Sequence, residues 1–299
     1  MSAAPTSPTA SFNTSSLVHN IYSHSTSTWQ YVVADRTTGH CIVLDPVRDR
    51  CIDPATISTS AADAIVDLVR GHGYTVDYIL KTHATSSQCL SAAWYLRMQF
   101  SNLQGWPPQL CNEATVTGLE AMWQRKYGAN NKFSTSIRAG LDDGESVTFG
   151  WLSLTCIHLP GFATLHRRAY VVGKDIFGAH SVAALTDDPS NIDPKDASES
   201  HIEESERHLD AWTSINRILS LPSDTRVWRA TGDDCAIEQT RTFDLVSQCT
   251  ALNKYSGMSK ADFLTGRMAE TQSLRDQEQR PPSYRVVGLR SRLESWIRA

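Results

Sequence analysis

The residues of this sequence best suited to chemistry lie in the stretch KTHATSSQ, residues 81–88. A strand is predicted before it and a helix after it, which is a typical setting for a metal-binding turn. Such a turn would carry histidines and an aspartate, but only His83 has an imidazole, and Thr85, Ser87 and Gln88 stand beside it. Hydroxyl and amide groups are poor ligands for zinc or ferrous iron. A histidine with polar neighbours instead suits general acid–base chemistry near neutral pH.

Two nucleophiles near this turn are alternatives to acid–base chemistry. Ser87 could be activated by His83, although the chain has no Gly-x-Ser-x-Gly turn of the kind that exposes a catalytic serine. Cys89 lies beside the same turn. The seven cysteines are scattered without a Cys-x-x-Cys pair, which is typical of reduced thiols packed as small apolar side chains.

The elements that must position the turn alternate between strands and helices. Periodicity and turn residues predict strands over 29–35, 39–47, 75–84 and 224–234, strand pairs over 142–161 and 169–182, and helices over 58–73, 87–100, 114–128, 208–221 and 259–270. Residues 186–206 are polar and acidic and are predicted to form a surface loop. Strand pairs alternating with helices indicate an α/β chain with two sheets between layers of helices.

Composition bounds the partners and the location. The net charge of −4 gives no basic face for nucleic acid, and no run approaches the ~20 apolar residues of a membrane helix. Residues 1–16 are rich in Ser, Thr, Ala and Pro and lack a signal-peptide pattern, so a disordered lead-in and a cytoplasmic protein are expected. Residues 17–299 are expected to form one domain with a C-terminal helical tail. The sequence leaves a homodimer open.

Several segments resemble the metallo-β-lactamase superfamily in order and spacing, most of all the subgroup of persulfide dioxygenases and glyoxalase II-like hydrolases. They are TSTWQYVVAD, VLDPV, the run from TSAADAIVDL to ILKTHA, LSAAWYL, DDGESVTFGWLSLTCIHLPG, LPSDTRVWRATGDD and ALNKYSGMSKADFL. The resemblance covers roughly residues 18–270 and implies an αββα sandwich, in which two mixed sheets lie between helices. It also implies a site in a cleft between the sheets.

The resemblance places the family's metal ligands on residues that mostly cannot serve as ligands. Of the first motif, His-x-His-x-Asp-His, only His83 is kept, and the other positions fall on Thr85, Ser87 and Gln88. Later ligand positions fall on a phenylalanine, a histidine in place of the bridging aspartate, and a threonine: Phe162, His180 and Thr231. We therefore expect that the dinuclear metal site is lost and that neither a metal nor another cofactor is required.

Three interpretations of the function remain open. The first is a metal-independent hydrolase, lyase or isomerase acting on a small organic substrate, with His83, His180 and Ser87 as catalytic residues. Its substrate-binding residues would be Thr85, Gln88, Phe162, His166, Thr231 and Asp233. The second is a pseudoenzyme that binds a small molecule or a protein. The third is a rearranged mononuclear metalloenzyme, in which His83 and His180 are joined by His158, His166 or Asp233. The basic run RRAY, residues 167–170, is expected to be solvated or salt-bridged rather than an anion site.

Overall fold

The computed structural model describes residues 16–49, 58–82, 91–111, 137–138, 140–162, 167–184, 201–230 and 242–278. The chain divides into two compact units, Met1–Met258 and Ser259–Ala299. Within the described part of the first unit, twelve strands form two six-stranded sheets. No helix in the described ranges is long and apolar enough to cross a membrane.

The first sheet has the strand order β1-β2-β3-β4-β5-β6. Its strands are β1 (Ser16–Ser23), β2 (Thr28–Asp35), β3 (His40–Leu44), β4 (Thr75–Leu80), β5 (Gln109–Cys111) and β6 (Ile137–Arg138). The pairs β1–β2 and β2–β3 are antiparallel, and the strands from β3 to β6 run parallel. Every residue of β2 is buried, including the polar Thr28, Gln30 and Asp35, as in a strand covered on both faces.

The second sheet has the order β12-β11-β10-β9-β8-β7. Its strands are β7 (Ser146–Phe149), β8 (Leu152–His158), β9 (Arg168–Val172), β10 (Asp175–Phe177), β11 (Arg226–Trp228) and β12 (Phe243–Leu245). Only β10 and β11 pair in parallel, so both sheets are mixed. The predicted pairs over 142–161 and 169–182 correspond to the antiparallel hairpins β7–β8 and β9–β10.

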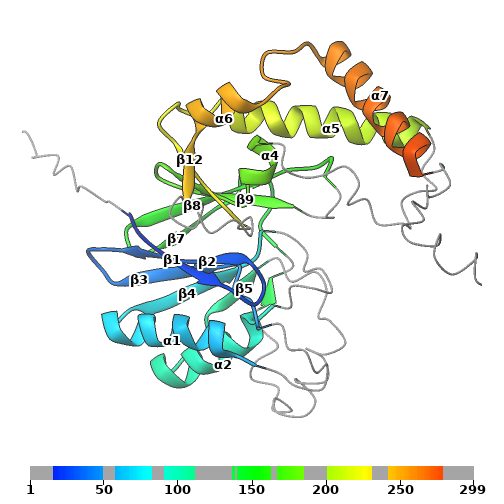
Figure 1. Cartoon of the computed structure of the whole chain (residues 1–299). Helices are drawn as coiled ribbons and strands as arrows, with labels where there is room; N and C mark the ends of the chain where they lie inside the picture. The colour runs from blue at the N-terminus through cyan, green and yellow to red at the C-terminus, as the bar shows by residue number, and fades with distance from the viewer. Residues whose placement is uncertain are drawn as a thin grey trace, which may run out of the picture. The chain divides into compact units, whose positions relative to one another are not determined.

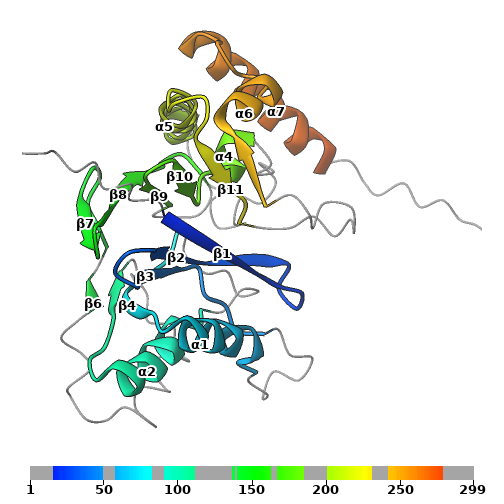
Figure 2. The same cartoon turned by 90° about the vertical axis from the view of Figure 1, so that its left-hand side faces the viewer.

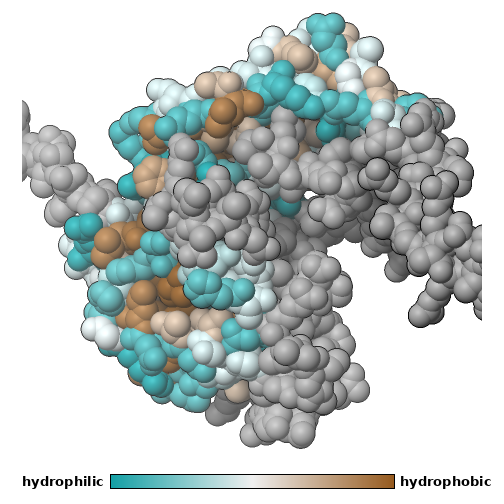
Figure 3. Space-filling model, viewed as in Figure 1, coloured by the Kyte–Doolittle hydropathy of each residue, from teal (hydrophilic) through white to brown (hydrophobic). Residues whose placement is uncertain are grey.

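Helices cover the outer faces of the two sheets, which confirms the predicted α/β sandwich (Figures 1 and 2). Beside the first sheet lie α1 (Ser60–His72) and α2 (Ala93–Gln104), and beside the second lie α4 (His180–Ala184), α5 (His201–Leu219) and α6 (Val246–Leu252). One apolar cluster fills the space between the sheets, and another lies under α1 and α2. On the face seen in Figure 3, hydrophilic residues dominate the described surface and hydrophobic ones form small separate groups.

The second unit contains the helix α7 (Lys260–Glu278). The hydroxyl of Ser259 accepts a hydrogen bond from the backbone N–H of Asp262 at 3.2 Å, so a side-chain cap marks the start of the helix. The helix predicted over 259–270 therefore begins where the sequence places it and continues for two more turns.

The predicted loop over 186–206 is wrong for its last part, because α5 begins at His201. Acidic residues in this segment suggested a solvated chain. Glu204 is instead only 1% exposed, and its carboxylate lies 3.8 Å from Nε2 of His208, one helical turn later and equally buried. Pairing between neighbouring turns allows this acidic segment to be a packed helix. Residues 1–15 lie outside the described residues, and Ser16 already belongs to β1.

A buried carboxylate at the start of β10 stabilises the second sheet. Asp175 is fully buried and accepts hydrogen bonds at 2.7 Å from both Nη2 of Arg226 and the indole N–H of Trp228. We expect Asp175→Ala to lower the free energy of unfolding by about 2 kcal/mol, because it leaves the Trp228 donor buried without this acceptor. Urea unfolding followed by circular dichroism measures the change.

The matched control is Asp224→Ala, since Asp224 pairs with Lys174 at an exposed position of the same sheet. Exposed ion pairs contribute little to stability, so this variant should leave the unfolding midpoint almost unchanged. If both variants lowered the free energy of unfolding equally, the burial of Asp175 would not increase its contribution to stability.

Candidate functional site

Backbone hydrogen bonds join the two sheets at the ends of β4 and β11. Predicted site residues follow both of these strands in the sequence. The backbone N–H of Arg168 donates to the carbonyl of Thr82 at 2.7 Å, joining β9 to the end of β4. The N–H of Trp29 donates to the carbonyl of Ala230 at 2.9 Å, joining β2 to the end of β11. These bonds hold the first sheet against the second at the points where residues 83 and 231 follow.

The end of β4 is fixed by Asp45, a non-glycine residue with a positive φ of 49°. Its carboxylate accepts one hydrogen bond from the backbone N–H of Thr82 at 2.8 Å and another from the hydroxyl of Thr82 at 2.6 Å. The hydroxyl of Tyr170 donates to the carbonyl of Lys81 at 2.9 Å. Backbone strain at Asp45 is thus offset by contacts that hold the residue before His83.

His180 is the first residue of α4 and is held by an acidic partner. Its Nε2 lies 2.8 Å from Oδ2 of Asp244 on β12, and the side chains are 12% and 6% exposed. The same carboxylate oxygen lies 3.2 Å from Nη2 of Arg229, which directly follows β11. One carboxylate therefore links an imidazole and a guanidinium. We call His180, Asp244 and Arg229 the His180 cluster.

The backbone of Arg229 is held from the first sheet. The hydroxyl of Tyr31 on β2 donates a short hydrogen bond to the carbonyl of Arg229. Burial, together with the Asp45 carboxylate, raises the pKa of Tyr31 well above its ordinary value. The phenol therefore stays protonated and remains a donor, so the position of Arg229 is set by a contact between the sheets.

A second arginine, Arg167, contacts both Phe162 and the residue next to His180. The guanidinium carbon of Arg167 is 5.8 Å from the centroid of the Phe162 ring. The same guanidinium donates a short hydrogen bond to the hydroxyl of Ser181, the residue after His180. The aromatic ring and the imidazole that the resemblance predicts for the site are therefore connected through Arg167 and Ser181.

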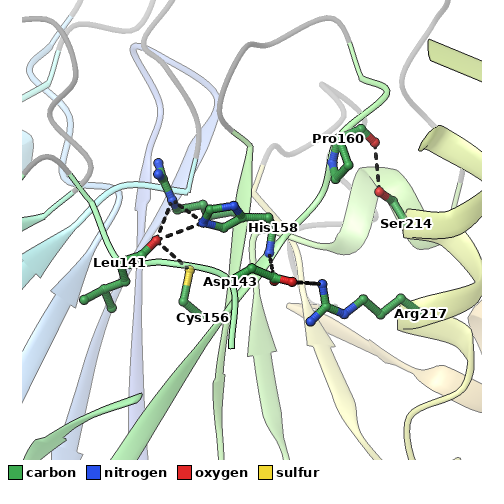
Figure 4. Close-up of polar contacts among 8 residues, drawn as sticks. Leu141, Asp143, Cys156, His158, Pro160, Ser214 and Arg217 are labelled. Atoms are coloured by element: carbon green, nitrogen blue, oxygen red, sulfur yellow. Dashed lines mark hydrogen bonds and ion pairs between the residues drawn. The ribbon is translucent and has the colours of Figure 1, made fainter. Parts of the chain in front are cut away.

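His158 has a structural position at the end of β8 (Figure 4). Its Nε2 lies 2.9 Å from the carbonyl of Leu141 and 3.1 Å from Nε of Arg168. Its backbone N–H donates to Asp143, which also pairs with Arg217 on α5. Burial opposes ionisation of Asp143, but these two donors hold the pKa of its carboxyl below the ordinary value. His158 thus ties the strand to its neighbours, and none of these contacts joins it to the His180 cluster.

The segment that leads to Phe162 rests on α5. The hydroxyl of Ser214 donates to the carbonyl of Pro160 at 2.8 Å (Figure 4). Gly161 has a φ of 89°, and a Cβ there would lie 2.1 Å from the backbone nitrogen of Ala211. Only glycine fits so close to the helix in this conformation. The contacts of Pro160 and Gly161 with α5 therefore fix the backbone just before Phe162.

The structure places two of the nine predicted site residues, His180 and Phe162, and connects them as described. The other seven lie outside the described residues: His83, Thr85, Ser87, Gln88, His166, Thr231 and Asp233.

Sequence reasoning missed Asp244, Arg229 and Arg167. Asp244 lies 64 positions after its partner His180, on a strand of three residues, so no short sequence motif indicates the pair. Arg167 is predicted to be solvated or salt-bridged; its guanidinium carbon lies 5.8 Å from the centroid of the Phe162 ring, a neighbour that the sequence did not indicate.

Of the ligand positions that the resemblance assigns, the structure describes two, Phe162 and His180. Phe162 carries no donor atom, whereas Nε2 of His180 contacts Asp244, as the second ring nitrogen of a metal-binding histidine commonly contacts a carboxylate. The guanidinium of Arg167 also brings a positive charge beside Phe162. Within the described ranges, no group of three or more His, Cys, Asp or Glu side chains could hold a metal ion. The chemistry that follows from these side chains is that of an imidazole, a carboxylate and two guanidiniums.

Comparison with known proteins finds no matching family model. The chain is 32% identical to a beta-lactamase hydrolase-like protein of Agrobacterium fabrum over 83% of its own length and 54% of that protein. It is 26% identical to a probable metallo-hydrolase of Burkholderia pseudomallei, over 71% of this chain and 70% of the relative. The chain spans about half the length of the first curated relatives it matches.

Solved structures share the fold at low sequence identity. ETHE1 from Myxococcus xanthus superposes with a TM-score of 0.55 and 15% identity, over 89% of this chain and 92% of that one. A metallo-beta-lactamase from Staphylococcus aureus superposes with a TM-score of 0.58 and 13% identity, over 83% of this chain and 67% of that one.

Proposed function

Because this chain belongs to the metallo-β-lactamase superfamily, we propose that it is a hydrolase-like enzyme that works without the metal ions of that superfamily. The observation that carries the proposal is the contact of His180 with Asp244 at 2.8 Å, at the position where the family pattern has a bridging carboxylate. The proposed substrate is a small organic molecule with a carbonyl group.

The contact with Asp244 determines which nitrogen of His180 carries the hydrogen. An ionised carboxylate accepts a proton, so the neutral imidazole carries its hydrogen on Nε2 and points it at Asp244. The other nitrogen, Nδ1, then has the lone pair that can take a proton. Asp244 also stabilises the imidazolium that forms when Nδ1 is protonated, as a carboxylate does for the histidine of a catalytic triad.

Arg229 keeps Asp244 suited to this role. Its Nη2 lies 3.2 Å from the carboxylate oxygen that His180 also contacts. A guanidinium at this distance favours the ionised form of the carboxyl group. The carboxylate then accepts from both partners, and His180 keeps one orientation.

The proposed reaction is the attack of water on a carbonyl carbon. Nδ1 of His180 takes one proton from the water as its oxygen bonds to the carbonyl carbon. The carbonyl oxygen becomes an oxyanion, and on its collapse the bond to the leaving group breaks. The imidazolium returns the proton to the leaving group. A lyase or isomerase reaction would use the same Nδ1 to move a proton from carbon.

We expect activity to survive removal of metal ions. The protein is dialysed against a chelator and assayed on chromogenic esters, thioesters and β-lactams, with metal content followed by elemental mass spectrometry. The hydrolysed substrate should give the same rate within about twofold before and after dialysis, because the resemblance places most of the family's ligand positions on Thr, Ser, Gln and Phe, which are poor ligands or none.

Other outcomes favour the other interpretations. Loss of activity on dialysis, with recovery when zinc or iron is returned, would overturn the proposal and favour a rearranged metalloenzyme, as the name of the Burkholderia relative suggests. Binding of a ligand without turnover of any substrate class would favour a pseudoenzyme.

A further inference from the structure

A pocket of about 480 Å³ opens at the surface at the beginning of β3. Asp45 and Thr82, which lead into the candidate site, lie beyond the other end of this strand. The lining combines residues of the first sheet and of the segment after α2 with the hairpin β7–β8, and it includes His40, Asp77, Trp106, Gln109 and Thr148. The volume is within the range of pockets that bind small molecules, about 300–1,000 Å³.

A bulge in β4 directs the acidic side chain of this pocket. Cys41 of β3 pairs with Val76, but the next residue of β3 pairs two positions later, so Asp77 opposes no residue of β3. An extra residue of this kind changes the direction of a side chain and is common beside functional sites. Here the carboxylate of Asp77 lies 2.8 Å from Nδ1 of His40, and the two side chains are 22% and 40% exposed.

The pair of His40 and Asp77 offers hydrogen-bond acceptors to the pocket. An ionised carboxylate can only accept, so the neutral imidazole carries its hydrogen on Nδ1, toward Asp77. Nε2 of His40 then has a lone pair, and no hydrogen-bond partner of this atom is found among the described residues. Burial raises the pKa of Asp77, and the hydrogen bond from His40 opposes the rise. A cation beside Asp77 would favour its ionised form.

Two side chains of α2 hold the aromatic wall of the pocket. The amide nitrogen of Gln104 donates to the carbonyl of Trp106 at 3.1 Å and to that of Val76 at 2.9 Å, and its oxygen accepts from the N–H of Val76 at 3.0 Å. The buried Arg97 donates from Nε to the carbonyl of Pro108 at 3.2 Å. The segment that carries Trp106 is therefore tied to β4 at the residue before the bulge.

The chemistry of the lining favours a positively charged ligand. Among the described residues that line the pocket, Asp77 carries the only charge while His40 is neutral. Trp106 is 54% exposed, and the face of an indole ring attracts cations as well as apolar groups. We propose that this pocket binds a small organic cation, an amine whose ammonium group contacts Asp77 and His40 and whose apolar part packs on Trp106. The site shares no residue with the His180 cluster and does not depend on the proposed function.

The test is calorimetric titration of the full chain with three indoles that differ in charge: tryptamine, tryptophol and indole-3-acetate. We expect saturable binding of the cation tryptamine, about tenfold weaker binding of the neutral tryptophol, and no binding of the anion. Asp77→Asn should weaken tryptamine binding about tenfold, the effect of losing one charge-assisted contact, and should leave tryptophol binding within about twofold. Equal affinities for the three indoles would overturn the proposal.

Trp106→Ala should weaken binding of both tryptamine and tryptophol about fivefold, because it removes the surface on which the indole packs. Trp151→Ala is the matched control, since Trp151 is 67% exposed and is not among the residues that line the pocket. It should bind tryptamine as the wild type does. His180→Gln should do the same, and weaker binding in that variant would place the amine in the candidate catalytic site and overturn the proposal.

Hydroxyl-radical footprinting of the wild-type protein makes the test independent of how the variants fold. Peptide mass spectrometry should show that saturating tryptamine lowers the oxidation of Trp106 relative to that of Trp151 in the same sample. The ratio cancels the radicals that the ligand itself consumes. Equal loss of binding in Trp106→Ala and Trp151→Ala, or an oxidation ratio that tryptamine does not change, would show that the pocket is not an amine site.

Discussion

Replacing His180 with glutamine is expected to lower kcat/KM about 10²- to 10⁴-fold on any substrate the protein hydrolyses. Glutamine preserves size and can still donate to Asp244, but it has no nitrogen that takes a proton at neutral pH. The loss therefore reports proton transfer rather than collapse of the cluster. Initial rates over a range of substrate concentrations should show the decrease mainly in kcat.

Asp244→Asn should give a smaller but still large decrease, because an amide cannot stabilise the imidazolium as a carboxylate does. His158→Gln is the matched control: it also replaces a half-buried histidine, but one at the end of β8 whose ring contacts Leu141 and Arg168. It should keep kcat/KM within about threefold after correction for the folded fraction. If His180→Gln retained more than one tenth of the wild-type activity, His180 would not be the catalytic base.

Where local pattern and packing agree, the sequence predicted the fold. The helix over 58–73 was expected from its apolar spacing and final glycines, and α1 buries Ile65 and Val69 and ends at Gly73 with a φ of 67°. Amphipathic spacing and a left-handed glycine after the last turn are local properties, so they can be predicted from one segment.

Elements with weak local signals were missed. The strand β12 has three residues and exists because Phe243 and Leu245 pair with Trp228 and Arg226 of β11. The first turns of α5 look like a solvated acidic segment until Glu204 meets His208 inside the fold. The contacts of β12 form only after distant parts of the chain have packed, and these override local propensity. The Glu204–His208 pair is local, but its burial depends on how α5 packs and is not visible in the segment's composition.

The candidate site also contains some residues that the sequence indicated and others that it did not. The resemblance of motifs selected His180 and Phe162 as candidate site residues from the order of the strands and turns. Their partners could not be located so, since Asp244 and Arg229 meet His180 only where β11 and β12 join the sheet. Chemistry that depends on a charged partner from another strand leaves no spacing in the sequence.

Gly178→Ala is expected to lower the free energy of unfolding by about 2–5 kcal/mol, because two costs add at this turn between β10 and His180. Its φ of 81° lies in the left-handed region, which costs a residue with a side chain about 1–2 kcal/mol. A Cβ would also lie 2.5 Å from Cβ of Thr82 and 2.7 Å from the carbonyl oxygen of Arg168. Overpacking of this kind costs about 1–3 kcal/mol.

Thr82 cannot easily yield to the added methyl group. Its N–H and hydroxyl are both bound by Asp45, and its carbonyl accepts from the N–H of Arg168 at 2.7 Å. Relief would therefore have to move the end of β4 away from the start of α4. Because His180 lies two residues after Gly178, the folded variant should also lose activity, beyond what its unfolded fraction explains.

Gly173→Ala isolates the first of the two costs. Gly173 has a φ of 59° in the hairpin between β9 and β10, but nothing lies within 4 Å of an added Cβ. It should lose only the ~1–2 kcal/mol of a left-handed alanine. The difference between the two variants in urea unfolding measures how tightly the sheets are held together at the site. If both lose the same amount, the contact between Gly178 and Thr82 relaxes without cost, and the edge between the sheets does not position His180.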